Sequence, residues 1–303
     1  MNTAPLRLFW WCPSRHLPAL RAEIKGSARA WCHLRAQSGR WLKNFGDELS
    51  PIVLQHLTGR EVVWAPPRRA DAIGIGSIIE YFHKHRGSDA LVFGSGLRGS
   101  VEGTGRGLNR SLGPIVGLRG PLSKEQLGVE PCFLGDPGVL VGDVYGAHRT
   151  VRKVLNGQVI LIPHFRAWQS KQDRLHISSV ENLGVRIVSP ASSPEVVLGE
   201  IRAAQLVLTS SLHGLICAHA MGVPTQFFSM ARDVANSEPT FKFDDYLATI
   251  HAGWKLGNLS TDFNEFKRTP QLVFDRAVEY GGIALERTEF MREEIKSSVN
   301  GNL

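Results

Sequence analysis

Short apolar runs alternate with amphipathic stretches along most of the chain, and the turns between them carry glycine, proline and small polar residues. Runs of about four to eight apolar residues predict buried strands, whereas apolar residues three and four positions apart predict helices. The predicted strands are 6–11, 61–65, 71–76, 89–93, 114–118, 158–163, 186–189, 206–209 and 225–228. The predicted helices are 52–57, 78–85, 121–127, 194–204, 212–221, 271–280 and 285–299. Strands that alternate with helices indicate an α/β fold with parallel sheets.

The stretch 206–228 shows this alternation most clearly. An apolar run ends at Thr209, a polar turn follows, and a helix-forming run then leads to Gly222 and a second strand. The turn contains Ser210, Ser211, His213 and Gly214. In open α/β sheets the carboxyl ends of the strands form the edge where ligands bind. The N–H groups at the start of the following helix favour an anion there.

The length of 303 residues, and a second alternating series that begins near residue 156, predict two α/β domains. We expect the first domain over 1–150 and the second over 151–285, with a linker near 146–156. Residues 286–303 predict a charged, amphipathic C-terminal helix that can pack back across both domains. Segment 14–40 lacks clean periodicity and is expected to be a mobile basic loop with helical pieces, and 100–113 a flexible loop.

Other predicted strands also end in polar turns. Asn44 and Asp47 precede a helix, and glycine-rich turns contain Ser77, Ser95 and Gly96. Each has a structural explanation beside the functional one, because Asn44 and Asp47 suit a helix cap and glycine pairs suit tight turns. These residues are therefore either local structure or the edge of a ligand site.

Charged side chains stand at the same predicted edge. Arg98 and Arg119 follow strands and can be directed at a ligand from there. Asp136 is followed by Pro137, so a simple turn also explains it. His164 comes after a buried strand and is a further candidate for the site.

The excess of basic over acidic residues limits the classes of partner that the chain is expected to bind. The net charge of +7 and the pI of about 9.4 suit nucleic acid, an anionic membrane surface or a phosphorylated small molecule. The basic residues are scattered, without a run of five or six, which argues against nucleic acid. In segment 14–40 they indicate either a solvated surface or a basic rim for an acidic acceptor or membrane.

The four cysteines form no C-x-x-C pair, and none stands beside a histidine at metal-ligand spacing. Neither a disulfide framework nor a metal site is expected. No signal peptide is visible, and no apolar segment approaches the roughly 18 residues of a membrane span. We expect a cytoplasmic protein that could dock peripherally on anionic lipid at the inner face of the cell membrane.

Seven short motifs along the chain form a familiar set. They are Asn44-Phe-Gly-Asp47, Gly74-Ile-Gly-Ser77, Gly94-Ser-Gly96, Arg119-Gly-Pro-Leu-Ser123, Gly135-Asp-Pro137, Ser210-Ser-Leu-His-Gly214 and Phe241-Lys-Phe-Asp-Asp-Tyr246. From about residue 44 to 247 the set resembles the polysaccharide pyruvyl transferase family, especially its exopolysaccharide ketalase branch. The strength of the resemblance lies in the order and spacing of the motifs, since each is short.

The resemblance implies two Rossmann-like domains that face each other across a central cleft, as in GT-B glycosyltransferases. It implies phosphoenolpyruvate as co-substrate, with no other cofactor. The acceptor would be a sugar of a bacterial exopolysaccharide or of its lipid-linked precursor, and the product a pyruvate ketal. Many members have an arginine two residues before the histidine, where this chain has Ser211. Arg98, Arg119 or Lys242 would then supply the charge, or the donor would sit differently.

Combining the motifs with side-chain chemistry assigns candidate roles. The expected catalytic residues are His213, Arg119 and Asp136. The expected donor-binding residues are Arg98, Ser210, Ser211, Gly214, Lys242, Ser95 and Gly96. The expected acceptor-binding residues are Asn44, Asp47, Ser77 and His164.

Proton transfer is the chemistry that His213 suits best. The helix start lowers its pKa while a bound phosphate raises it, so titration near pH 7 is expected in the complex. Asp136 and Asp47 are next, either to orient His213 or to receive the acceptor's proton. The structural alternatives are a capping or packing histidine and, for Lys242, a solvated lysine.

Two other functions fit the same features. One is a GT-B-type glycosyltransferase that uses a nucleotide sugar, although no glutamate is clearly placed for a ribose. The other is a non-catalytic sugar- or phosphate-binding protein of a polysaccharide assembly complex.

Overall fold

The structure is a computed structural model that describes residues 4–87, 89–100, 106–147, 150–151, 157–230 and 240–299. The strands of its first half are β1 (Leu6–Phe9), β2 (Val62–Trp64), β3 (Ala72–Ile73), β4 (Ala90–Ser95), β5 (Leu112–Leu118) and β6 (Phe133–Leu134). The helices are α1 (Leu17–Ser38), α2 (Phe45–Thr58), α3 (Ile79–Lys84), α4 (Arg106–Asn109), α5 (Pro121–Leu127) and α6 (Val141–Tyr145). Short 3₁₀ turns are η1 (Pro13–Arg15), η2 (Pro67–Arg69) and η3 (Pro137–Leu140).

The second half repeats the alternation. Its strands are β7 (Val159–Ile162), β8 (Arg186–Ile187), β9 (Leu206–Thr209), β10 (Thr225–Phe228) and β11 (Ser260–Thr261). Its helices are α7 (Lys171–Glu181), α8 (Pro194–Ala203), α9 (Leu212–Met221), α11 (Phe241–Ile250), α12 (Phe263–Arg268) and α13 (Pro270–Val299). Its 3₁₀ turns are η4 (Phe165–Trp168) and η5 (Leu256–Leu259).

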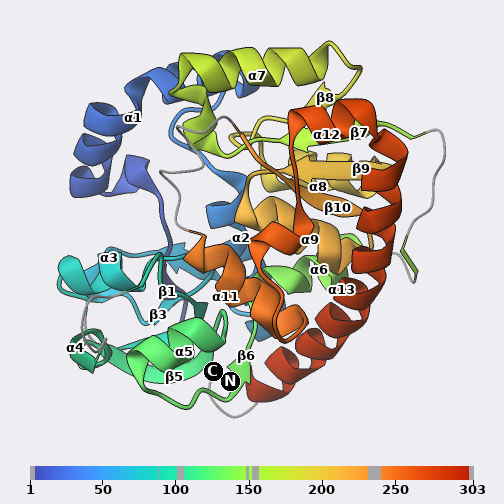
Figure 1. Ribbon diagram of the computed structural model, residues 1–303. Coiled ribbons are helices and arrows are strands. Elements are labelled where there is room, and N and C mark those ends of the chain that lie inside the picture. Colours follow the sequence, from blue (N-terminus) through green and yellow to red (C-terminus); the bar gives the residue numbers. More distant parts are fainter. Residues whose placement is uncertain are drawn as a thin grey trace.

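The strands form two parallel sheets, each surrounded by helices (Figure 1). The first has six strands in the order β2-β1-β3-β4-β5-β6, and the second has five in the order β11-β10-β9-β7-β8. Counted along the chain, both sheets follow the doubly wound pattern 2-1-3-4-5, and the first adds a sixth strand. The predicted α/β class is confirmed, and each predicted strand is present. The two-residue strands β6 and β11 were not predicted, and the expected loop 100–113 and linker 146–156 lie partly outside the described residues.

Helix α9 lies between the elements of both halves (Figure 1). All ten of its residues are buried, and it packs against α8, α13, η3 and α6. A helix that is apolar all round is stable only when other elements cover it on every side. The chain around 206–228 is therefore the centre of the molecule and not merely one crossover unit.

Segment 14–40 forms the 22-residue helix α1, so the prediction of a mobile loop was wrong. The buried positions recur every three or four residues and are Ala19, Glu23, Ser27, Ala30, Trp31 and Leu34. Several of these side chains are small or polar, which hides the helical period from a hydrophobicity pattern. Gly39, in the left-handed conformation, ends the helix.

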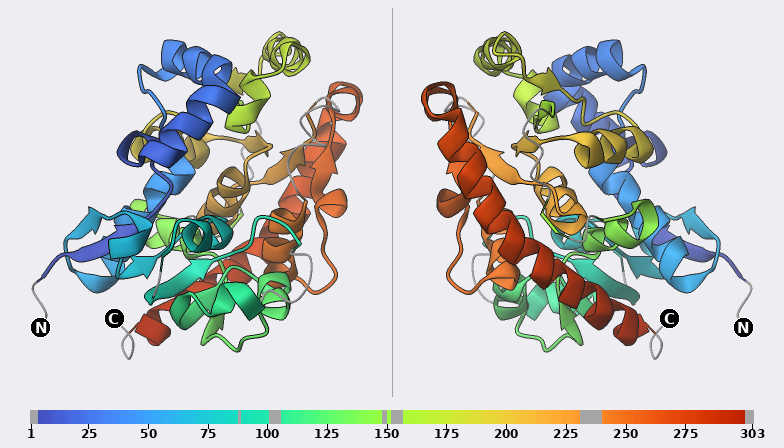
Figure 2. Two further views of the ribbon diagram at one scale, coloured as in Figure 1. Left: turned by 90° about the vertical axis from the view of Figure 1, so that its left-hand side faces the viewer. Right: turned by 90° about the vertical axis from the view of Figure 1, so that its right-hand side faces the viewer.

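The C-terminal part is one continuous helix, α13, where the sequence predicted two segments. Gly281 lies inside it, where an added Cβ would be in ordinary contact with Val151, at 3.4 Å. The helix runs from β10 of the second sheet to β6 of the first (Figure 2). Near its end, Arg292 forms an ion pair with Asp143 at 3.3 Å. The helix therefore fastens the two halves together. No helix in the described part of the chain has the length and apolar character needed to cross a bilayer.

A buried ion pair joins the halves at a second point. Arg119, which follows β5, lies 2.9 Å from Asp245 of α11, and both side chains are fully buried. Asp245 also accepts hydrogen bonds from the backbone N–H of Ser123 at 2.9 Å and from its hydroxyl at 2.6 Å. The Arg119 guanidinium also donates from Nη1 to the Ser77 hydroxyl and from Nη2 to the Leu97 carbonyl. One side chain thus holds four segments in register.

Replacing this arginine should destabilise the fold strongly. Arg119→Met leaves the Asp245 carboxylate buried without its counter-ion, and we expect a loss of about 3–5 kcal/mol in the free energy of unfolding. Arg119→Met combined with Asp245→Asn keeps one acceptor for the Ser123 N–H, lets the amide NH2 donate to the Ser123 hydroxyl and removes the charge, so it should recover part of the loss. Urea unfolding of the three proteins measures this. Equal stability of wild type and the single variant would contradict a structural role for the pair.

Candidate functional site

A pocket of about 380 Å³ lies where the two sheets present the carboxyl ends of their central strands. From the first sheet, Trp11 follows β1, and Gly76 and Ser77 follow β3. From the second, His164 follows β7 and Ser211 follows β9. These strand pairs, β1/β3 and β7/β9, are the points where the strand order of each sheet reverses. Ligands of doubly wound folds bind at such points, and here both contribute to one pocket.

The pocket collects eight of the predicted site residues. They are Asn44, Asp47, Ser77, Arg98, His164, Ser211, His213 and Lys242. The other six candidates do not line it and are Ser95, Gly96, Arg119, Asp136, Ser210 and Gly214. The two groups differ in depth. Most residues of the second group lie one layer behind the pocket wall and shape it.

His213 occupies the second position of α9 and is held by the start of α2. The Asn44 side chain caps α2 by accepting from the Gly46 N–H at 3.1 Å. Gly46 lies so close to the imidazole that an added Cβ would be 2.1 Å from Nδ1. Burial, with Lys242 and Arg119 nearby, lowers the pKa of His213 to about 3. In this structure the imidazole is therefore neutral at physiological pH, where the sequence suggested titration near pH 7 for the complex.

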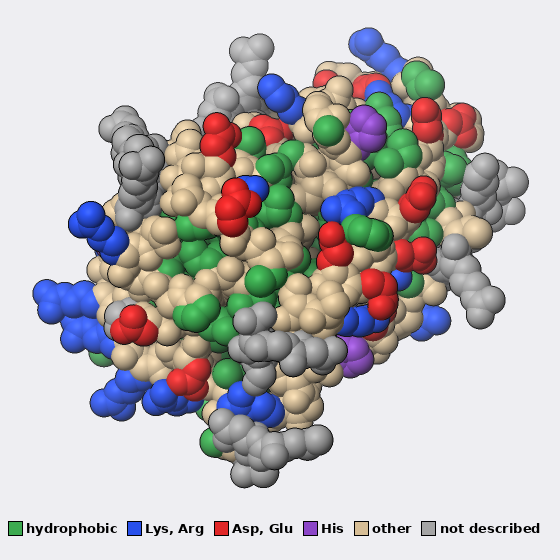
Figure 3. All heavy atoms as spheres, turned by 90° about the horizontal axis from the view of Figure 1, so that it is seen from below, with side chains coloured by type: hydrophobic (Ala, Val, Ile, Leu, Met, Phe, Trp, Pro, Cys, Tyr) green, Lys and Arg blue, Asp and Glu red, His purple; other side chains and the backbone are tan. Residues whose placement is uncertain are grey.

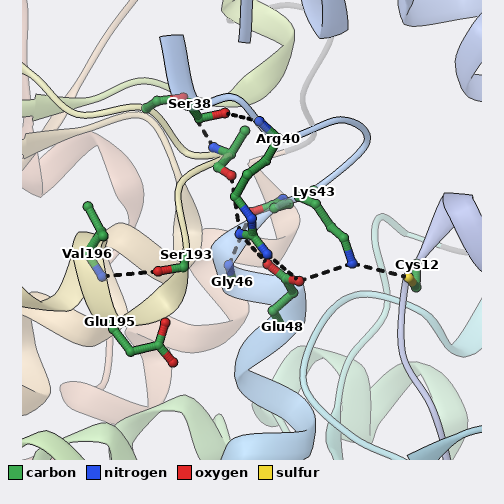
Figure 4. Close-up of polar contacts among 12 residues, drawn as sticks. Cys12, Ser38, Arg40, Lys43, Gly46, Glu48, Ser193, Glu195 and Val196 are labelled. Atoms are coloured by element: carbon green, nitrogen blue, oxygen red, sulfur yellow. Dashed lines mark hydrogen bonds and ion pairs between the residues drawn. The ribbon is translucent and has the colours of Figure 1, made fainter. Parts of the chain in front are cut away.

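Two adjacent carboxylates begin α2, and their surroundings separate their roles. Glu48 receives both cations at this turn: Arg40 bonds it with two nitrogens, at 2.8 and 3.0 Å, and Lys43 lies 3.2 Å away (Figure 4). Asp47 faces the pocket instead. Burial and the charges of Glu48 and Glu23 raise the pKa of Asp47 to about 8, although Lys242 opposes this rise. Asp47 is therefore mainly protonated at neutral pH and can donate a proton.

Cationic side chains from both halves also reach the pocket. Arg98 and Lys84 come from the first half, and Lys242 and Arg166 from the second. The Arg166 guanidinium lies 5.5 Å from the centre of the Phe165 ring, in a cation–π arrangement. The backbone N–H of Arg166 donates to Nδ1 of His164 at 3.4 Å, so the two residues are oriented together. This set suits a ligand with more than one negative group.

The residues behind the wall have structural partners. An added Cβ at Gly96 would be 2.5 Å from the Arg119 guanidinium carbon, so only glycine leaves room for it. The Ser95 hydroxyl donates to the Gly76 carbonyl at 2.8 Å, and the Ser210 hydroxyl accepts from the His164 N–H at 2.8 Å. Each contact fixes a loop that lines the pocket, so these residues position the site from behind.

The remaining two candidates complete that layer. Gly214 lets α9 approach β9, since an added Cβ would be 2.4 Å from the Thr209 hydroxyl. Asp136 is fully buried and caps η3 by accepting from the Gly138 N–H at 2.8 Å. Burial raises the pKa of Asp136 to about 6. Direct donor or catalytic contact by these residues stays a prediction, because the described pocket surface does not include them.

Sequence reasoning missed several of the residues that line the pocket. They include Trp11, Glu23, Glu80, Tyr81, Lys84, Phe165 and Arg166. Arg166 could have been found, because it follows His164 at the carboxyl end of a predicted strand. Glu23 could not, since it reaches the pocket only because α1 folds against η4. Within the described ranges, no group of three or more His, Cys, Asp or Glu side chains is arranged to hold a metal ion.

The chain is similar to known proteins over much of its length. A family model described as polysaccharide pyruvyl transferase matches residues 44–230. The chain is also similar to the succinoglycan biosynthesis protein ExoV of Rhizobium meliloti (strain 1021), with 28% identity over 216 residues. That match covers 68% of this chain and 61% of ExoV, so it spans less than two thirds of the relative's length.

The raised pKa of Asp47 should make the protein less stable as the pH rises. Its folded pKa of about 8 lies above the model-compound value of 3.8, so the stabilisation is complete below pH 3.8 and disappears as the pH rises through 8. Asp47→Asn should remove this dependence, and its melting temperature should fall less than that of wild type over the range. Glu48→Gln is the control: it loses ion pairs and should be less stable at neutral pH. If the melting temperatures of wild type and Asp47→Asn changed equally with pH, the raised pKa assigned to Asp47 would be refuted.

Proposed function

The chain belongs to the polysaccharide pyruvyl transferase family, and on that premise we propose that it transfers the enolpyruvyl group of phosphoenolpyruvate to a sugar. The acceptor is a unit of a bacterial exopolysaccharide or of its lipid-linked precursor, and the product is a pyruvate ketal. The observation that supports this best is one pocket that combines His213, Asp47 and cations from both halves. Phosphoenolpyruvate is the only co-substrate that the proposal requires. The relative's name, with its reference to succinoglycan biosynthesis, supports a polysaccharide acceptor.

We propose a GT-B-like division of labour in which residues 1–150 form the acceptor side and 151–285 the donor side of a cleft. Helix α9 begins in the pocket, so the positive end of its dipole favours the donor's phosphate or carboxylate. Arg166 and Lys242 stand on the same side, and Arg98 faces them from the first half. Arg98, Lys242 and Arg166 are therefore the pocket cations that can supply the charge of the family arginine absent at Ser211.

The reaction must add two sugar oxygens to C2 of the donor and one proton to C3. The first hydroxyl attacks C2 and gives up its proton while C3 gains one, so the double bond is lost without a net change of protons. The second hydroxyl then attacks C2, phosphate leaves with the C–O bond electrons, and the second proton departs with it. A base and an acid that face one pocket satisfy these needs.

His213 and Asp47 have the protonation states that this sequence of steps requires. His213 is neutral because its pKa is lowered to about 3, and it can accept the proton of the sugar hydroxyl once a bound phosphate raises that pKa. Protonated Asp47 can deliver the proton to C3, since its pKa is raised to about 8. Asn44 caps the helix that carries Asp47, and Arg119 acts as a positioning residue through Ser77. Two groups pushed apart in pKa are a common way to divide acid and base roles.

Substitution of either group should reduce turnover sharply. We expect His213→Ala and Asp47→Asn to lower kcat by about a hundredfold or more. In wild type, kcat/KM should fall as the pH rises through about 8, where Asp47 loses its proton. Phosphate release from phosphoenolpyruvate in the presence of acceptor measures this. Activity of His213→Ala within about threefold of wild type would remove it from proton transfer, and the exposed Asp275→Asn serves as a control.

A glycine pair tests the position of His213 without removing it. Gly46→Ala would push the imidazole aside, because the new Cβ would be 2.1 Å from Nδ1. Gly199→Ala makes the same change inside α8, where no heavy atom lies within 4 Å of the new Cβ. We expect the first variant to lose at least about tenfold in kcat/KM while both remain folded, since a small misplacement is costly. Equal activity of the two variants would contradict the role given to His213.

Ligand binding separates the proposed function from its rivals. A rise in melting temperature with phosphoenolpyruvate but not with nucleotide sugars supports pyruvyl transfer. The reverse result would favour a glycosyltransferase. Binding without phosphate release in the presence of an acceptor would favour a non-catalytic binding protein.

A further inference from the structure

Helix α1 presents an outer face that the pocket does not use. Its outward positions include the large apolar side chains Leu17 and Ile24, which are 65% and 49% exposed. The basic side chains on the same exposed side are Arg21, Lys25, Arg29 and Arg35. Positions 17, 21, 24 and 28 are three or four apart and therefore lie along one line of the helix. We call Leu17, Arg21, Ile24, Lys25, Arg29 and Arg35 the α1 outer face.

The charge on this face is of one sign. The single acidic residue of α1, Glu23, points inward, where it is 7% exposed and accepts a hydrogen bond from the Trp31 ring N–H at 2.9 Å. None of the ion pairs found among the described residues involves Arg21, Lys25 or Arg29. The opposite end of the molecule carries acidic and basic side chains together (Figure 3). The α1 outer face, by contrast, carries charge of one sign.

The neighbourhood of α1 extends the same character. Helix α7 lies at the same end of the molecule and exposes Lys171 and Leu175, the latter by 59% (Figures 1 and 2). The beginning of α1 also borders a hollow of about 450 Å³. Its lining includes Arg68, Arg69, Lys84 and Arg86. Lys84 lines the proposed active pocket as well, so the basic surface continues to the pocket mouth.

We propose that the α1 outer face docks on a bilayer surface rich in anionic lipid. Lysine and arginine near such a surface gain about 1 kcal/mol each, and exposed Leu17 and Ile24 can enter the boundary between head groups and acyl chains. The alternation of basic and apolar side chains on one exposed helix face matches this environment on both counts. The helix lies in the plane of the interface and does not cross it.

Docking through α1 would also fix the position of the pocket. Glu23, on the inner side of the same helix, lines the pocket. The pocket would then lie about one helix diameter, roughly 10–12 Å, from the lipid surface. An acceptor held at the membrane could reach it without a large movement of the protein. The docking itself requires neither the donor nor turnover, so it can be tested apart from the proposed reaction.

Vesicle sedimentation tests the proposal on the full chain. We expect wild type to pellet with vesicles of equal parts phosphatidylcholine and phosphatidylglycerol, and not with phosphatidylcholine alone. The triple variant Arg21→Gln, Lys25→Gln, Arg29→Gln should bind the anionic vesicles about a hundredfold more weakly. Leu17→Ser with Ile24→Ser should also weaken binding, and added salt should weaken binding of the wild type.

A charge-matched control separates this face from the general basicity of the chain. The variant Arg110→Gln, Lys267→Gln, Arg268→Gln removes three exposed basic residues elsewhere and should bind as wild type does. Equal weakening by both triple variants, or equal binding to neutral and anionic vesicles, would overturn the proposal. So would retention on nucleic acid or an acidic protein with no vesicle binding. All the altered side chains are exposed, and unchanged melting temperatures verify that the variants fold.

Discussion

The buried ion pair between Arg119 and Asp245 is the constraint on which the site depends. Its two partners come from opposite halves of the chain, and both are fully removed from water. Such a pair is stable only when hydrogen bonds satisfy the remaining donors and acceptors. Here Ser77, Leu97 and Ser123 do so, and each belongs to a loop or helix start near the pocket. The pair thereby couples the joining of the halves to the shape of the pocket wall.

The repeated strand order explains how one pocket can accommodate both substrates of the proposed transfer. Each doubly wound sheet has one reversal point, and a single domain of this kind offers one crevice. When two sheets turn their reversal points toward each other, each crevice supplies one wall. The α9 wall carries His213 and an anion-favouring helix start, whereas the α2 wall carries Asp47. A donor and an acceptor can then approach from different halves.

Burial gives opposite protonation states to His213 and Asp47, the two groups that we propose transfer protons. The same low-dielectric pocket disfavours the charged form of both, which neutralises His213 and keeps the proton on Asp47. The neighbouring Glu48 instead pairs with Arg40 and Lys43 and turns away from the pocket. A difference of one residue along α2 thus decides which carboxyl can act as an acid. The α1 outer face, which we propose docks on lipid, differs from the pocket because its basic side chains are exposed to water.

The sequence by itself determined every strand except the two-residue β6 and β11, the parallel α/β class and the turns that carry the site, because these depend on local periodicity. It also pointed to His213 and Asp47, since both stand next to strand ends or helix starts. Tertiary structure alone decided that Arg119 is a buried joint and that Glu23 reaches the pocket. It also decided the state of Asp47, because a pKa depends on neighbours such as Glu23 that are distant in sequence. Helix α1 escaped prediction for the same reason: its inner face is polar enough to look like a loop until its partners cover it.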